Sequence, residues 1–321
     1  MLERGYYTMS IVLGTTAALV SAGGAIAAVS EFMYKLAIKR TSKEFLSQRS
    51  ELGELDEWQK QAQANEEWRS AHPFEELTLY AYDGLKLHGY YFAANIPTHK
   101  LAILVHGYSG QGLDMATYAG IYTDTLGFNV FMPDNRGHGK SEGHYIGFGW
   151  HDRLDILKWI EYFVERFAGQ VEIVLHGVSM GGATVLMTSG ENLPSQVKAI
   201  VADCAYTSVH EELTYQLKQM FKLPRFPLLY TTSIACRLHA GYSFKEATAL
   251  EQVKRARTPI LFIHGEEDTF VPTHMVHPLH EHCGSEKELW LVPGAAHGAS
   301  VLVDYEGYRE RTRQFVSRYV N

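Results

Sequence analysis

The stretch VEIVLHGVSMGGATVLM, residues 171–187, changes from one hydrophobic pattern to another at its centre. Its apolar beginning, up to Leu175, favours a buried strand, and the residues after Ser179 have a helical pattern. Between the two, Gly177 and Gly181 leave room for a sharp turn that exposes the Ser179 hydroxyl at the edge of a sheet. A serine hydroxyl needs such exposure to a substrate and a base before it acts as a nucleophile. The stretch therefore predicts an α/β fold in which Ser179 is a candidate nucleophile.

Strand and helix patterns alternate from Glu75 to the end of the chain. Two alternating runs joined at Asp83-Gly84 predict an antiparallel hairpin, and later near-continuous apolar runs predict a buried parallel sheet. Helical patterns lie between the runs, as in residues 152–167, and another covers residues 305–320. The eight predicted strands are 77–82, 85–92, 101–105, 129–132, 171–175, 197–201, 259–263 and 288–292. We therefore expect a doubly wound α/β domain over residues 75–321.

Composition and charge limit the classes of function. Hydrophobic residues make up 46% of the chain and charged residues 20%, as expected for one core with an ordinary polar surface. The formal charge of -7 is spread along the chain without a long basic run, so a nucleic acid partner is not expected. The cysteines are odd in number and far apart, which favours buried free thiols over a disulfide framework; they are Cys204, Cys236 and Cys283.

Four histidines lie close together on a probable helix, at positions 274, 277, 280 and 282. Pro278 interrupts this run, and no carboxylate or cysteine completes a familiar metal-ligand spacing. We therefore expect no metal and no other cofactor.

The N-terminal part of the chain has a composition of its own. No charged residue lies between Arg4 and Glu31, and residues 11–29 form an apolar run long enough to cross a bilayer. We expect a membrane anchor in residues 1–30, with a signal peptide cleaved at Ala25-Ile26-Ala27, and hence secretion, as the alternative. More basic residues follow the run than precede it, which favours a cytoplasmic main domain. Residues 31–74 are charged and predict a helical connector, either a stalk or an arm lying on the domain.

Two further motifs follow predicted strands. HGEEDTFVP occupies residues 264–272, and PGAAHG occupies residues 293–298 after the last strand. With the turn at Ser179, they make the chain from about residue 75 resemble the α/β-hydrolase superfamily, in the group of monoacylglycerol lipases and serine aminopeptidases. The resemblance implies a mostly parallel eight-stranded sheet with helices on both faces. It also implies a small helical cap, at about residues 210–253.

The resemblance also implies a catalytic triad in the order serine, acid, histidine. The nucleophile is then Ser179, and the HGEED loop aligns its acid with Asp268. The general base is His297, whose tautomer a buried carboxylate fixes by accepting the proton of Nδ1. The rival acids are Glu266, Glu267 and Asp203.

Two backbone N–H groups are predicted to stabilise an oxyanion. One belongs to Met180, directly after the nucleophile, and the other to Tyr108 in the loop HGYSG, residues 106–110. The loop DNRGHGKS, residues 134–141, resembles another signature of the superfamily, and we assign it a structural role at the edge of the site.

These motifs favour a serine hydrolase that cleaves carboxylic esters with small or medium apolar acyl groups, acting on a small-molecule substrate. Apolar and aromatic residues of the expected cap agree with an apolar substrate group, although they would equally pack the cap on the core. A serine peptidase or thioesterase is the alternative within the enzyme class. The alternative outside it is a membrane-linked binding protein without catalysis. The oligomeric state is left open.

Overall fold

A computed structural model describes residues 23–41 and 55–320 of the chain. An eight-stranded sheet runs through it in the order β1-β2-β4-β3-β5-β6-β7-β8. The strands are β1 Glu75–Tyr80, β2 Lys86–Phe92, β3 Lys100–Val105, β4 Asn129–Asp134, β5 Glu172–Val178, β6 Val197–Asp203, β7 Ile260–Gly265 and β8 Lys287–Val292. The pairs β1–β2 and β2–β4 are antiparallel and the others are parallel, which confirms the expected fold class.

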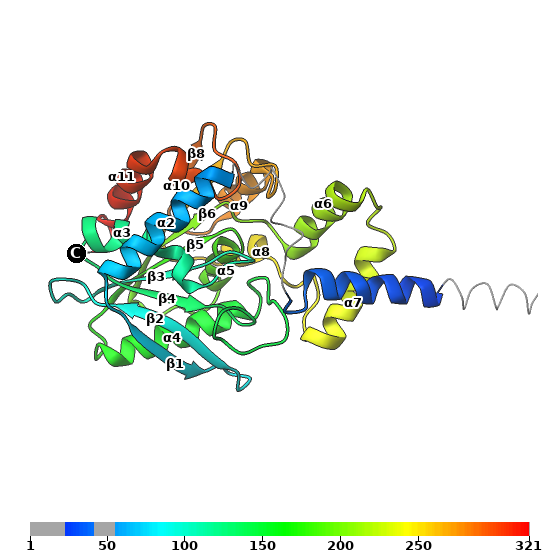
Figure 1. Ribbon diagram of the computed structural model, residues 1–321, viewed down its shortest axis with the longest axis horizontal. Coiled ribbons are helices and arrows are strands. Elements are labelled where there is room, and N and C mark those ends of the chain that lie inside the picture. Colours follow the sequence, from blue (N-terminus) through cyan, green and yellow to red (C-terminus); the bar gives the residue numbers. More distant parts are fainter. Residues whose placement is uncertain (1–22, 42–54, 321) are drawn as a thin grey trace, which may run out of the picture.

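Helices cover both faces of the sheet because successive strand residues point to opposite sides. Leu101 and Ile103 of β3 belong to one apolar core and Ala102 and Leu104 to the other. Helices on the first side are α4 Asp152–Arg166, α5 Met180–Ser189, α8 Ala249–Val253 and α9 Val276–His282; on the second lie α2 Leu55–Ala71, α3 Ala116–Gly120, α10 Ser300–Val303 and α11 Tyr305–Val316. The layers are visible in Figure 1.

Two helices project from the layered body beyond the sheet: α6 Val209–Phe221 and α7 Leu228–Ala240 (Figure 1). They lie within the cap predicted at about residues 210–253. Their neighbour α8 packs against α5 in the body instead. The cap therefore consists mainly of α6, α7 and the turn between them.

The described parts of the N-terminal region lie on the domain as an arm. A helix over residues 23–37, here called the N-terminal helix, runs beside α7 (Figure 1). Helix α2 follows later and is fastened to the domain, because Asn65 Nδ2 donates to the carbonyl of Asp114 at 3.2 Å. The predicted membrane anchor falls mostly on residues 1–22, outside the described residues. No helix within the described residues is long and apolar enough to span a bilayer.

Several element boundaries differ from the predicted ones. Strand β5 continues past Leu175 to Val178, because His176 and Gly177 still pair with Leu104 and Val105 of β3. The last helix ends at Val316 rather than 320. Pro278 does not interrupt the histidine-rich segment: it lies in the first turn of α9, where a missing N–H costs no intrahelical hydrogen bond.

Candidate active site

Ser179 lies at the turn between β5 and α5, in a backbone conformation with φ of +56° that few residues other than glycine adopt. Neighbouring glycines make the turn possible. A Cβ atom at Gly177 would lie 2.1 Å from the carbonyl oxygen of Gly181, and one at Gly181 would lie 1.9 Å from that of Val105. The Ser179 N–H donates to the carbonyl of Asp203 on β6 at 2.9 Å. The turn is thus held rigidly and leaves the serine side chain partly exposed.

His297 reaches Ser179 from the loop between β8 and α10. Its Nε2 lies 2.8 Å from Ser179 Oγ, and its Nδ1 lies 2.8 Å from Asp268 Oδ2. A neutral imidazole in this position donates through Nδ1 to the carboxylate and accepts through Nε2 from the serine hydroxyl. The structure therefore brings together the three residues that the motifs singled out.

Asp268 is buried in the loop after β7. Its Oδ1 accepts hydrogen bonds from the backbone N–H groups of Phe270 and Val271, at 3.0 and 2.9 Å. Burial alone would raise the pKa of this carboxyl. The charge of His297 and the hydrogen bonds from His264 and His297 outweigh burial and lower the pKa to about 2. Asp268 therefore stays ionised throughout the neutral range.

The rival acids lie elsewhere. Glu266 and Glu267 are exposed on the same loop. Asp203 is fully buried, its Oδ1 accepts from the Ser300 hydroxyl at 3.1 Å, and burial raises its pKa to about 6. Of the four acids, Asp268 is the one whose carboxylate contacts His297.

A thiol also lies beside the site. Cys204 Sγ, a carboxylate oxygen of Asp268 and a ring nitrogen of His297 are within 4.8 Å of one another, a set of donor types that also occurs around metals. Burial raises the pKa of the Cys204 thiol well above its usual range. Both ring nitrogens of His297 already have partners, so a metal would have to replace one of these hydrogen bonds. The arrangement is suited to proton transfer rather than to metal binding.

The loop after β3 runs past the nucleophile. A Cβ atom on Gly107 would lie 3.6 Å from Ser179 Cβ. The loop is braced by residues 134–141, because His138 Nε2 donates to the carbonyl of Tyr108 at 2.6 Å and Asn135 Nδ2 donates to that of His106 at 3.1 Å. Met180, the other predicted oxyanion donor, opens α5, where the first N–H groups have no carbonyl partner within the helix.

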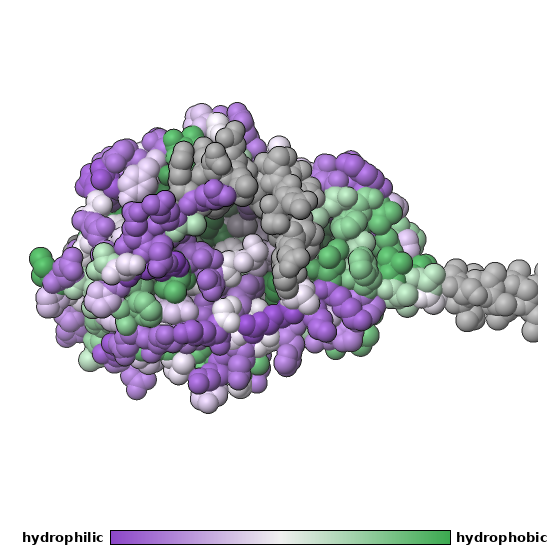
Figure 2. All heavy atoms as spheres, in the orientation of Figure 1, coloured by the Kyte–Doolittle hydropathy of each residue, from purple (hydrophilic) through white to green (hydrophobic). Residues whose placement is uncertain are grey.

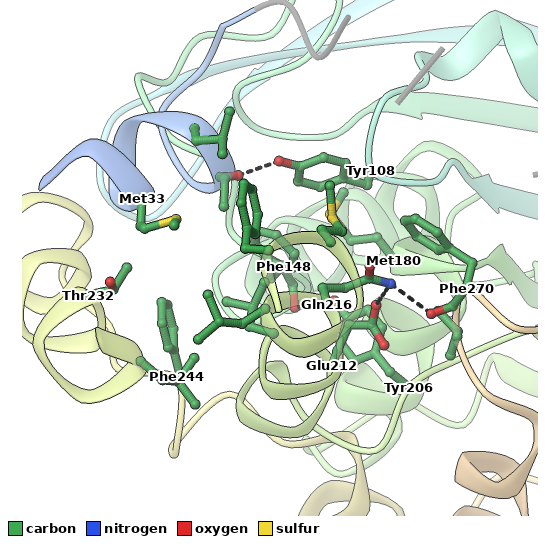
Figure 3. A pocket seen from close by; sticks show the side chains of 18 of the residues that line it. Met33, Tyr108, Phe148, Met180, Tyr206, Glu212, Gln216, Thr232, Phe244 and Phe270 are labelled. Carbon is green, nitrogen blue, oxygen red and sulfur yellow. Dashed lines mark hydrogen bonds between the residues drawn. The ribbon is translucent and has the colours of Figure 1, made fainter. Parts of the chain in front are cut away.

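An apolar pocket begins at Ser179. The space that it encloses, including the part open to solvent, is about 900 Å³, and its lining is mostly apolar, as in many small-ligand sites. Figure 3 shows Met33 of the N-terminal helix and Thr232 of α7 on one side, and Met180 and Phe270 on the other. Among the apolar residues of the cap, Met220, Phe221, Leu228 and Leu229 line the pocket, whereas Phe226 is exposed to solvent.

The N-terminal helix is tied to the pocket at several points. The Tyr108 hydroxyl donates to the carbonyl of Ala37, and Ser30 Oγ donates to Thr231 Oγ1 on α7 at 2.6 Å. After the helix, the N–H of Ile146 donates to the carbonyl of Ile38 at 2.7 Å. The helix is therefore a wall of the pocket and not a free stalk.

One carboxyl group lies in the apolar wall. Glu212 on α6 is 4% exposed, and its Oε1 accepts from Gln216 Nε2 at 2.9 Å (Figure 3). Its Oε2 is buried without a hydrogen-bond partner among the described residues. Burial outweighs the Gln216 hydrogen bond and raises the pKa of Glu212 to about 8. The side chain is therefore mostly protonated and neutral at pH 7.

Two family profiles match the chain. The α/β hydrolase fold family matches residues 102–234, and a serine hydrolase family, FSH1, matches residues 180–297. The esterase Pf2001 of Pyrococcus furiosus superposes with a TM-score of 0.64 at 22% identity, over 78% of this chain and 94% of the esterase. The chain has the α/β-hydrolase fold.

Other proteins resemble this chain over much of its length. YqkD of Bacillus subtilis is 27% identical over 313 residues, 96% of this chain and 97% of YqkD. The membrane protein YNL320W of Saccharomyces cerevisiae is 26% identical over 246 residues, which are 76% of this chain and 80% of YNL320W. An acylaminoacyl peptidase of Pyrococcus horikoshii superposes with a TM-score of 0.55 at 20% identity, over 77% of this chain and 41% of the peptidase. Together with the two family profiles, these matches support the α/β-hydrolase fold and a similarity to serine hydrolases.

Three parts of this candidate site were not predicted from the sequence. His264 Nε2 lies 3.2 Å from Asp268 Oδ2 and 2.9 Å from the carbonyl of Val271; its place at the start of the HGEED motif was a usable signal. The pocket wall formed by the N-terminal helix had a weaker signal, since its apolar residues were attributed to an anchor and a connector. Glu212 had none, because it follows the exposed Glu211 in an ordinary amphipathic helix.

Proposed function

We propose that the protein hydrolyses carboxylic esters with small or medium apolar acyl groups, through an acyl-enzyme on Ser179. One observation carries the proposal: Ser179 Oγ lies 2.8 Å from His297 Nε2 at the edge of an apolar pocket. An acyl chain next to the nucleophile fits such a pocket, because the burial of its apolar surface favours binding.

The reaction begins when Ser179 Oγ attacks the ester carbonyl carbon and His297 Nε2 accepts the hydroxyl proton. Asp268 accepts the hydrogen bond from Nδ1 and stabilises the imidazolium that forms. The backbone N–H groups of Met180 and Tyr108 are the proposed donors to the oxyanion. His297 then protonates the departing alcohol. Finally, a water molecule gives its proton to His297 and attacks the acyl-enzyme, and His297 returns that proton to Ser179 Oγ as the acid leaves.

An amide or thioester substrate is the second candidate, because the fold neighbours include an acylaminoacyl peptidase. An enzyme that binds a free substrate amine needs carboxylates that are ionised at neutral pH. Burial raises the pKa of Glu212, the carboxyl in the pocket wall, to about 8. This neutral group favours an uncharged substrate, and hence an ester over an aminopeptidase substrate.

We also infer that residues 1–30 attach the protein to a membrane. The apolar run of residues 11–29 supports this inference, and the yeast relative is named a membrane protein. A signal peptide is the alternative, and N-terminal sequencing of the protein from its own cells distinguishes the two.

The first experiment measures hydrolysis of p-nitrophenyl esters of increasing acyl length by the full chain in detergent. We expect an optimum at a small or medium acyl group that disappears in Ser179→Ala, while Ser317→Ala, a change at an exposed serine, keeps full activity. A fluorophosphonate probe should label the wild type and not Ser179→Ala. Turnover of amides or thioesters alone would favour the second candidate. Absence of labelling in the folded wild type, or equal labelling of both proteins, would contradict catalysis by Ser179, and absence of labelling would favour a binding protein without catalysis.

A further inference from the structure

The exposed large apolar side chains of the protein gather on one side. Seven of the thirteen found among the described residues lie on the N-terminal helix, α6, α7 or the turn between α6 and α7. They form what we call the apolar face: Val29, Phe32, Phe221, Phe226, Tyr230, Ile234 and Leu238. Figure 2 shows hydrophobic surface over this part of the molecule. Single exposed apolar residues are ordinary, but a gathered patch marks an interaction surface.

Contacts between the N-terminal helix and α7 make the apolar face one continuous surface. Ser30 donates to Thr231 at 2.6 Å, and the rings of Tyr34 and His239 lie 4.8 Å apart, so the N-terminal helix and α7 are neighbours. On α7, Ile234 and Leu238 are one turn apart and are 60% and 78% exposed.

The apolar face borders the substrate pocket. Phe221 is 38% exposed and also lines the pocket, and so belongs to both. On the N-terminal helix, Met33 and Leu36 face the pocket, whereas Val29 and Phe32 are exposed. A molecule that leaves an apolar medium at this face therefore has a short path to Ser179.

Charge and chain order indicate what covers the apolar face. Residues 209–246 contain five lysines and arginines and three glutamates, although the whole chain has a formal charge of -7. Lys222 and Arg225 are exposed beside Phe226 and form no ion pair within the described residues. Basic residues next to apolar ones fit anionic lipid headgroups above an acyl layer. In addition, the apolar residues 11–22 lead directly into the N-terminal helix.

We propose that the apolar face lies against a phospholipid bilayer and that Lys222 and Arg225 contact its anionic headgroups. The cap then binds the membrane surface in addition to any N-terminal anchor. We further infer that the substrate is a lipid-like ester that enters the pocket from the bilayer. This inference rests on the proposed ester hydrolysis.

A depth measurement tests the surface without using activity. The full chain, carrying Leu238→Cys labelled with an NBD fluorophore, is inserted into vesicles of phosphatidylcholine and phosphatidylglycerol with or without brominated acyl chains. The native cysteines are buried, so the introduced thiol takes the label. Ile96→Cys is a matched control, because Ile96 is 79% exposed, like Leu238 at 78%, but lies on the loop before β3, at the opposite end of the parallel strands.

We expect the brominated lipid to quench NBD at position 238 and to leave NBD at position 96 unchanged. Position 238 unquenched would overturn the proposal, since the anchor alone would then touch the membrane. A blue-shifted but unquenched NBD at position 238 would overturn it too, because a second protein copy would then cover the face. Equal quenching at both positions would also contradict it.

A second experiment tests entry of the substrate. Ile234→Asp combined with Leu238→Asp should lower hydrolysis of an ester embedded in vesicles on the order of tenfold, because both changes oppose contact with lipid. Hydrolysis of a soluble ester should stay unchanged, and Ile96→Asp should affect neither. Equal loss on both substrates, or no loss on either, would contradict entry from the bilayer. A wild type inactive on every ester would instead contradict the proposed function and leave the quenching result standing.

Discussion

At the scale of single residues, the site depends on Ser179, whose backbone conformation is unfavourable for a residue with a side chain. Ser179 has a φ of +56°, a conformation that costs on the order of 1–3 kcal/mol for a residue with a side chain. The pairing of β5 with β3 and the hydrogen bond from Ser179 N–H to Asp203 hold it there. These contacts hold the hydroxyl within hydrogen-bond distance of His297 before any substrate arrives.

The geometry predicts which of the buried acids matters for turnover. Asp268→Asn should lower kcat on the order of 10³-fold or more, because an amide in that position no longer holds His297 in the required tautomer. Asp203→Asn should cost much less, since Asp203 bonds to Ser300. Steady-state kinetics on one ester, with melting curves to show that both variants fold, checks this. A larger loss in Asp203→Asn would assign the acid to β6.

The buried carboxyl of Glu212 predicts how stability depends on pH. Burial raises its pKa to about 8, so the folded protein keeps a proton that the unfolded chain releases above its ordinary pKa of about 4.5. The free energy of unfolding should therefore fall as the pH rises from about 5 to 8, by up to a few kcal/mol.

Glu212→Gln should remove the part of this fall that Glu212 contributes, because glutamine has nearly the same shape and no charge. We expect the variant to unfold at higher urea concentration than the wild type at pH 8, and at a similar concentration at pH 5. The exposed neighbour provides a control, and Glu211→Gln should leave the pH dependence as it is. Parallel pH profiles for wild type and Glu212→Gln would show that this carboxyl is ionised in the folded state.

At the scale of elements, the N-terminal helix lines the pocket, and we therefore expect it to influence which substrates are accepted. Met33→Trp should shift the preferred ester to a shorter acyl chain and raise KM for long ones, because the larger ring fills part of the pocket. Phe32→Trp is the matched control, since Phe32 is 58% exposed on the same helix. The acyl-length series on both variants checks the prediction. An unchanged optimum in Met33→Trp would show that the acyl chain binds elsewhere in the pocket.

At the scale of the whole molecule, the sequence predicted the layered sheet well because its signals are local. The hairpin at Gly84, the apolar strand runs and the turn at Ser179 each depend on a few neighbouring residues. The meeting of Ser179, Asp268 and His297 could be expected as well, since parallel strands bring the loops at their carboxyl ends together.

What the sequence did not predict depends on contacts between distant segments. Tyr108 bonds to Ala37 across 71 residues, and this link makes the N-terminal helix part of the pocket. The raised pKa of Glu212 similarly comes from burial against the body, which no local pattern encodes. Helical periodicity indicates which side of such a segment is apolar, but not which part of the protein that side will meet.

The origin of the pocket walls has a consequence for how proteins of this kind diverge. The reacting groups are held by the sheet, whereas much of the space that receives the substrate is bounded by a cap and by a helix that precedes the sheet in the chain. Mutations in those outer segments can therefore change the accepted molecule while the strained turn and its histidine stay intact. Selection for different substrates can therefore act on a part of the gene that encodes none of the reacting residues.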